Sequence, residues 1–150
     1  MPGFNGATSE PINTNNAESI REKLDVPSNS EMNTAIQQLA TISNVTLTSS
    51  GNANINGMIA QKTGNIVTIN GYLTASSAFG STSTKVCTIA AGARPGSYLR
   101  IPVALSTQAY LPPTNFGYLN IDTNGSVNII ASSGNTGTAA YFNITYIAQN

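Results

Sequence analysis

Residues 99–105 read Leu-Arg-Ile-Pro-Val-Ala-Leu, with a large apolar side chain at every second position. Residues 142–146, Phe-Asn-Ile-Thr-Tyr, alternate in the same way, and Val67, Ile69 and Leu73 share one face of a third segment. Because successive side chains of a strand point to opposite faces of a sheet, an apolar period of two predicts strands with one buried face. These segments therefore favour a mainly β fold.

The strand pattern extends from residue 45 to the C-terminus and predicts about eight strands. Stretches rich in Gly, Asn and Thr separate them, such as Asp-Thr-Asn-Gly at 122–125, and these residue types favour turns. Many short strands joined by turns indicate an antiparallel β-sandwich of jelly-roll type, so residues 45–150 are expected to form a head domain. The strands are expected near residues 45–49, 54–61, 65–75, 84–90, 98–105, 115–122, 125–132 and 139–148.

The region before the head carries helical signals. Ala17, Ile20 and Leu24 recur at helical spacing and predict a short helix over residues 16–24. Pro27 ends that helix, because the residue before a proline is disfavoured in the helical conformation.

A second helix is predicted from Ser28 to about Ser43, since Ser28 and Glu31 have the spacing of a capping box. Its apolar side chains fit the a and d positions of two heptads, which predicts a short parallel bundle of three copies, a trimeric stalk. The alternative is that the same stripe packs on the sheet of its own chain. The stalk positions are Met32, Ala35, Ile36, Leu39 and Ile42.

Residues 1–15 are rich in Gly, Pro, Asn, Ser and Thr, a composition that does not form a packed core alone. We expect them to be an arm that docks on another protein of the same assembly, with Phe4 and Ile12 as the candidate docking residues. The expected domains are this docking arm at 1–15, a helical adaptor and trimeric stalk at 16–44, and the head at 45–150. The N-terminus lacks the basic and apolar regions of a secretion signal, so synthesis in the cytoplasm is expected.

Charge is scarce and unevenly distributed. Charged residues make up 8% of the 150 residues, and histidine is absent, whereas an average soluble domain has about 25% charged residues. Without histidine the usual general base and the commonest metal ligand are missing. Asp122 is the one carboxylate from residue 45 onward, so a head has no carboxylate pair for glycoside hydrolysis. We therefore expect no enzyme, no catalytic residues, no cofactor and no metal.

The partners expected from charge and hydropathy are limited too. The head carries four basic residues and one acidic residue, a net charge of +3, and the whole chain has a net charge of +0. The chain has no basic patch of the kind that predicts nucleic-acid binding. It also has no run of eighteen apolar residues, so no membrane insertion is expected. The mildly positive head is compatible with anionic glycans, or with ordinary solvated surface charge. Cys87, the single cysteine, lies in an apolar stretch and is expected to be a buried, inert thiol.

The segment at 108–118 combines aromatic and neutral hydrogen-bonding side chains, the composition of a saccharide-binding loop. Its candidate ligand residues are Tyr110, Asn115 and Phe116. The alternative is that these aromatic rings fill the core or contact another subunit.

Several predicted strands also carry apolar side chains on their second face. A monomeric sandwich would expose that face to water, so its apolar character favours subunit packing. The alternative is an imperfect pattern in an ordinary domain. The residues concerned are Ile66, Tyr72, Ile130, Tyr141 and Ile147.

Residues 24–28 read Leu-Asp-Val-Pro-Ser. This phrase resembles the end of the adaptor helix that leads into a trimerising helix in bacteriophage trimeric fibre and tail-tip receptor-binding proteins. Similar phrases to those of phage fibre heads occur at residues 60–71, 89–95, 125–129 and 142–147. The resemblance implies a homotrimer with a β-sandwich head, and it carries over no sugar site.

The resemblance implies a structural virion protein on the particle surface, and two roles follow. In the first, the head attaches to a host cell-surface saccharide and the arm docks on the tail. In the second, the protein is a capsid head fibre or decoration protein, anchored to the capsid by its arm. A third hypothesis, outside the phage class, is a bacterial carbohydrate-binding module.

Overall fold

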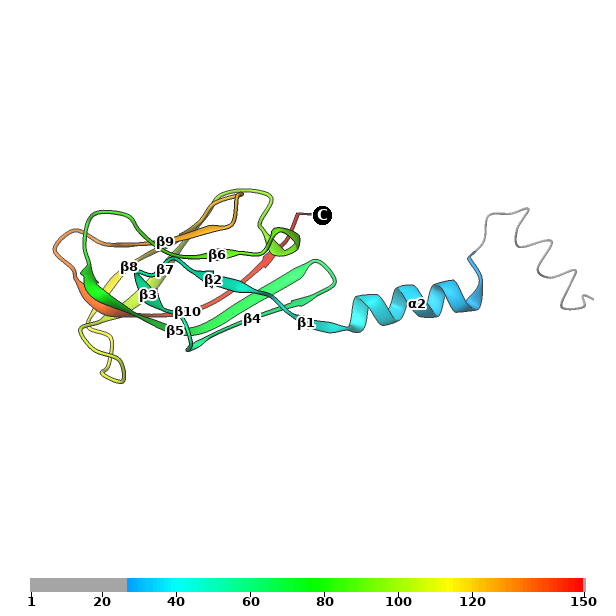
Figure 1. Ribbon diagram of the computed structural model, residues 1–150, viewed down its shortest axis with the longest axis horizontal. Coiled ribbons are helices and arrows are strands. Elements are labelled where there is room, and N and C mark those ends of the chain that lie inside the picture. The colour runs from blue at the N-terminus through cyan, green and yellow to red at the C-terminus, as the bar shows by residue number, and fades with distance from the viewer. Residues whose placement is uncertain (1–26, 150) are drawn as a thin grey trace, which may run out of the picture. The chain divides into compact units, whose positions relative to one another are not determined.

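The computed structural model describes residues 27–149, which are mainly β with one short helix (Figure 1). The chain divides into two compact units between Leu39 and Ala40. The predicted arm, with Phe4 and Ile12, and the predicted helix over 16–24 lie outside the described residues. Within the described part, no helix is long and apolar enough to cross a membrane.

The helix of the first unit, α2 (Asn29–Ala40), begins at the predicted capping box. The Glu31 backbone N–H donates to Ser28 Oγ at 3.1 Å, and the Ser28 backbone N–H donates to Glu31 Oε2 at 2.6 Å. The two bonds satisfy N–H groups that the first turn of a helix leaves without partners, so this prediction is confirmed. The apolar side chains of Met32, Ile36 and Leu39 are exposed on the helix.

The second unit is built from strands joined by short turns, with one 3-10 turn at Ala91–Ala93. The strands are β1 (Ile42–Asn44), β2 (Leu47–Ser49), β3 (Ala53–Asn54), β4 (Met58–Thr63), β5 (Ile66–Phe79), β6 (Thr84–Ile89), β7 (Leu99–Ser106), β8 (Asn115–Ile121), β9 (Ser126–Ala131) and β10 (Gly137–Ile147).

The strands form one curled sheet in which all pairings are antiparallel. The strand order is β1-β4-β5-β10-β7-β8-β9-β6-β2, and β3 pairs with β5. Its two ends, β1 and β2, are neighbours in the chain. Between them the Val45 N–H donates to the Ala60 carbonyl at 2.8 Å, and the Thr46 carbonyl accepts from the Ala90 N–H at 3.1 Å. Residues 42–49 therefore pass from one end of the sheet to the other, which leaves less unpaired strand edge.

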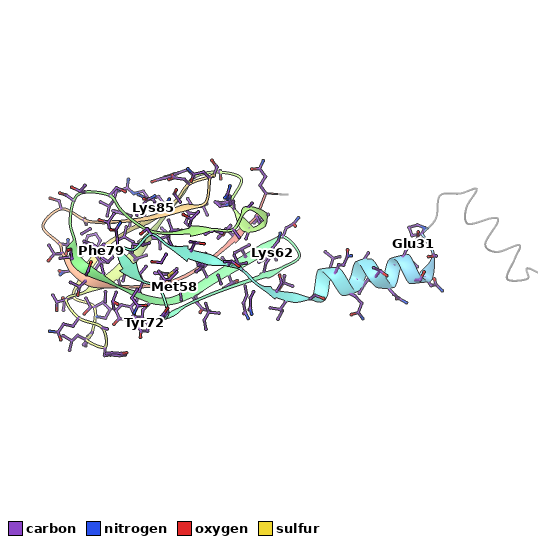
Figure 2. The ribbon with its side chains drawn as sticks, viewed as in Figure 1. Glu31, Met58, Lys62, Tyr72, Phe79 and Lys85 are labelled. Atoms are coloured by element: carbon purple, nitrogen blue, oxygen red, sulfur yellow. The ribbon has the colours of Figure 1, made fainter. Side chains whose placement is uncertain are left out.

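The core lies inside the curl, where β6 and β9 face β4 and β5 across it (Figure 1). Val67, Ile69 and Leu73, which share a face by their spacing, are all buried, as is Phe79 at the end of β5 (Figure 2). Each such side chain contributes about 1.5–3 kcal/mol when fully buried. The period-two prediction is thus confirmed for β5, and the same inward alternation recurs in β9 and β10.

The structure corrects two boundaries. Ile42 was predicted as the last stalk position of the helix, but the helix ends at Ala40 and Ile42 lies in β1, paired with Thr63. A β-branched isoleucine prefers a strand, and the partner strand β4 supplies the pairing that the local pattern does not show. The predicted strand at 54–61 is in fact β3 and β4, separated by a turn in which the Met58 N–H donates to the Ile55 carbonyl.

Cys87 is fully buried in β6, as predicted, and burial raises the pKa of its thiol to about 12. Only the thiolate reacts with thiol reagents, and at pH 8 a pKa of 12 leaves about one molecule in 10,000 ionised.

We therefore expect a disulfide reagent such as dithionitrobenzoate to label Cys87 negligibly in the native protein at pH 8. Labelling should become complete within minutes after denaturation in guanidinium chloride, as followed by absorbance. Fast labelling of the native protein would contradict the burial of this thiol.

Candidate functional site

Tyr110 projects from the loop between β7 and β8, with 85% of its surface exposed. Its backbone has a φ of 73°, in the left-handed region that residues other than glycine rarely adopt. The Tyr110 N–H donates to the Tyr141 hydroxyl at 2.9 Å, which ties the loop to the outer face of β10. Such a backbone persists when its surroundings hold it, and it occurs often in ligand-binding loops.

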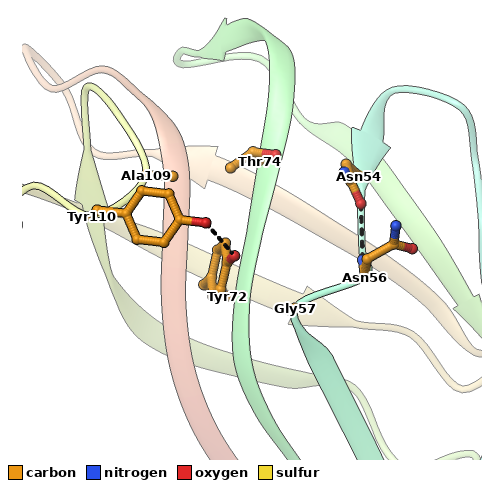
Figure 3. Close-up of a pocket in the computed structure, with 7 residues that line it drawn as sticks. All are labelled: Asn54, Asn56, Gly57, Tyr72, Thr74, Ala109 and Tyr110. Atoms are coloured by element: carbon orange, nitrogen blue, oxygen red, sulfur yellow. Dashed lines mark hydrogen bonds between the residues drawn. The ribbon is translucent and has the colours of Figure 1, made fainter.

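Tyr72 connects this loop to the sheet. The Tyr72 and Tyr110 hydroxyl oxygens lie 3.2 Å apart in a hydrogen bond, and their ring centroids are 6.0 Å apart in an edge-to-face arrangement (Figure 3). On the other side, the centroids of Tyr72 and Tyr141 are 5.9 Å apart, because these residues face each other in the register of β5 and β10. The three tyrosines thus support one another on the outer face.

Two glycines bring a third segment against Tyr72. A Cβ at Gly57 would lie 2.7 Å from Cε1 of the Tyr72 ring, so only glycine leaves room for that ring. Gly71 has a φ of 118°, and a Cβ there would clash with the Gly57 carbonyl oxygen. Because glycine has no Cβ, these two positions let the turn between β3 and β4 approach β5 closely.

These elements enclose a cleft of about 270 Å³ (Figure 3). Its wall combines a tyrosine platform with side-chain amides and a hydroxyl. Asn54 Oδ1 accepts the Asn56 backbone N–H at 2.9 Å, which fixes the orientation of the Asn54 side chain. The lining residues are Asn54, Asn56, Gly57, Tyr72, Thr74, Ala109 and Tyr110.

The cleft is uncharged. None of its lining side chains carries a formal charge at neutral pH. The hydrogen bond with Tyr110 and the proximity of that phenol raise the pKa of Tyr72 above its ordinary value of 10.0. Tyr72 therefore stays protonated to a higher pH than a free tyrosine does. Among residues 27–149, no group of three or more His, Cys, Asp or Glu side chains is placed to hold a metal ion.

The structure separates the three residues of the predicted ligand loop. Tyr110 lines the cleft, whereas Asn115 and Phe116 do not. The Asn115 side-chain amide donates to the Thr136 carbonyl at 2.7 Å, which links β8 to the turn before β10. Phe116 is 53% exposed on the outer face. Ala104 of β7 pairs with Tyr141 of β10 on one side and with Phe116 of β8 on the other, so Phe116 lies two strands from Tyr141.

Three further side chains that line the cleft were not predicted from the sequence: Asn54, Asn56 and Thr74. The segment Gly-Asn-Ala-Asn-Ile-Asn-Gly at 51–57 carries the available signal, with asparagine at every second position. The pairing of β3 with β5, in which Asn54 faces Thr74, brings this segment to the cleft beside Tyr72.

A second feature of the outer face is a row of isoleucines at the opposite end of the same strands. In register order, Ile42 pairs with Thr63, Thr63 with Ile66, and Ile66 with Ile147. All three isoleucines are exposed, Ile147 to 72%. The predicted apolar second face is therefore present at Ile66 and Ile147, and Ile42 adds to it.

The Tyr141 hydroxyl can be tested as the anchor of the Tyr110 loop. In the variant Tyr141→Phe, the Tyr110 N–H loses its acceptor, and a hydrogen bond of this kind contributes about 0.5–1.5 kcal/mol. We expect exchange of the Tyr110 amide hydrogen, measured by NMR or mass spectrometry, to accelerate by roughly three- to tenfold. The control is Tyr118→Phe, because the Tyr118 ring centroid lies 4.1 Å from the Arg100 guanidinium carbon and makes no contact with the Tyr110 N–H. This variant should leave the exchange rate of the Tyr110 amide unchanged. An unchanged rate in Tyr141→Phe would remove the anchor role.

Comparisons with known proteins give structural similarity alone. No protein-family model matches the chain, and no curated protein sequence matches it. Among solved structures, it is similar to the receptor binding protein (gp15) of Listeria phage PSA, with a TM-score of 0.57 and 15% sequence identity. The match covers 93% of this chain and 82% of the other. The chain thus has a fold similar to that of a phage receptor binding protein.

Proposed function

We propose that this protein is a receptor-binding protein on the surface of a bacteriophage particle, and that its Tyr110 cleft attaches to a saccharide of the host cell surface. The observation that carries the proposal is the fold similarity over 93% of the chain to a phage receptor binding protein. In this proposal the N-terminal arm docks on another virion protein, and the head presents the cleft without catalysis.

The chemistry of the cleft supports saccharide attachment. The apolar face of a sugar ring packs on aromatic side chains, and its hydroxyls need partners that both donate and accept hydrogen bonds. Tyr110 offers an exposed ring, and Asn54 and Asn56 offer amides that carry both a donor and an acceptor. A cleft held by a sheet and a fixed loop also loses little conformational entropy when a ligand binds.

We further propose that the protein is a homotrimer. Two exposed apolar surfaces support this: the helix stripe of Met32, Ile36 and Leu39, and the row formed by Ile42, Ile66 and Ile147. A helix of 12 residues is only marginally stable alone in water. Packing against two further copies would bury its stripe, and association of heads would cover the isoleucines.

Attachment is tested with the variant Tyr110→Ala, which removes the exposed ring from the cleft. We expect binding of the labelled protein to host cells, measured by flow cytometry, to fall by at least tenfold, as is usual when a central aromatic contact is lost. Tyr98→Ala is the matched control, because Tyr98 is 52% exposed and does not line the cleft. Unchanged binding by Tyr110→Ala would contradict attachment at this cleft.

The trimer is tested with Leu39→Asp, which places a charge in the proposed helix seam at a cost of several kcal/mol. We expect light scattering coupled to chromatography to give a smaller mass, or a mass that decreases on dilution. Asn33→Asp is the matched control, since Asn33 is one residue from Met32 on the polar side of the heptad pattern. A Leu39→Asp variant that kept the parent mass at all concentrations would show that the helix is not the seam.

A further inference from the structure

We propose that the Tyr110 cleft selects an uncharged sugar unit and discriminates against phosphorylated or sulfated polymers. This inference rests on the proposed receptor-binding function and names the chemical class of its ligand. The net charge of +3 on the head is compatible with anionic glycans, but the cleft itself favours an uncharged ligand.

The cleft offers hydrogen-bonding groups that are not engaged within the described part of the chain. Asn54 uses its Oδ1 for the Asn56 N–H, and among residues 27–149 its Nδ2 makes no hydrogen bond. Within the same described part of the chain, the Asn56 amide and the Thr74 hydroxyl make none either. These groups offer both donors and acceptors, and adjacent sugar hydroxyls need both, whereas a phosphate or sulfate oxygen only accepts.

The basic side chains of the described head lie away from the cleft. Anionic groups are bound in proteins by Arg and Lys through charge-assisted hydrogen bonds. The described head has four such residues, and none lines the cleft. Lys62 Nζ donates to the Gly92 carbonyl at 2.5 Å, Arg94 Nε donates to the Ile89 carbonyl at 3.3 Å, and Arg100 lies over the Tyr118 ring. Three of the four are therefore engaged elsewhere.

The cleft contains no acidic or basic side chain that titrates between pH 5 and pH 8. The hydrogen bond with Tyr110 raises the pKa of Tyr72 above its ordinary value of 10.0. The asparagine and threonine side chains do not titrate. A ligand that meets only these groups would bind equally well at pH 5 and pH 8.

At about 270 Å³, the cleft is slightly below the roughly 300–1,000 Å³ of pockets that enclose a drug-sized ligand. This volume has room for a single sugar residue.

The experiment uses the full-length protein on a glycan array. The array carries oligosaccharides ending in glucose, galactose or N-acetylglucosamine beside poly(glycerol phosphate) and sulfated polysaccharides. Binding is measured at 50 mM and 500 mM salt and at pH 5 and pH 8. The variants are Asn56→Ala and Tyr110→Ala in the cleft, with Lys85→Gln as a control that removes a charge outside it.

The expected result is binding to one or more uncharged glycans, with an affinity that changes less than twofold with salt or pH. Asn56→Ala should weaken that binding roughly three- to tenfold through lost hydrogen bonds, Tyr110→Ala should weaken it more, and Lys85→Gln should not change it. Binding to an anionic polymer that requires Tyr110 and falls at least tenfold in high salt would overturn the ligand class while keeping the cleft as the site. Binding to a glycan that survives Tyr110→Ala would overturn the cleft as the attachment site, and no binding to any glycan on the array would overturn the proposed attachment to a saccharide.

Discussion

The register between β5 and β10 is the constraint on which the rest of the head depends. Ten residue pairs join the two strands, including Leu73 with Ala140 on the core side and Tyr72 with Tyr141 on the outer side. Because side chains alternate between faces, a slip of one residue would move the tyrosines inward and the leucine outward. The packed core and the aromatic support of the cleft are thus two sides of the same pairing.

This register also places two different surfaces on the outer face of one sheet. At one end, the row of Ile42, Ile66 and Ile147 presents apolar surface. At the other, Tyr72 and Tyr141 hold the Tyr110 loop above a polar cleft. The strands between them carry neutral Thr and Asn side chains, such as Thr68 hydrogen-bonded to Thr145 at 3.1 Å. The surface proposed for association and the cleft proposed for attachment are therefore separated along the strands.

The local features of this fold could be predicted from the sequence, and the long-range ones could not. Alternation located most strands to within a few residues, and Ser28 with Glu31 located the start of α2, because both signals arise from neighbouring residues. The strand order, the place of Ile42 in β1 and the split into β3 and β4 depend on pairing between distant segments. Tyr110 was predicted from composition. Asn54 and Asn56, which line the same cleft, come from a distant segment of the chain.

The proposed occupation of the Tyr110 cleft by a host glycan can be observed by an NMR titration of the isotope-labelled protein with solubilised cell-wall glycan from a susceptible host. If the glycan lies in the cleft, the Asn54 and Asn56 side-chain amides and the ring signals of Tyr72 and Tyr110 shift, and the rest of the spectrum stays unchanged. Shifts confined to the region of Arg100 and Tyr118, or along the isoleucine row, would contradict this occupation.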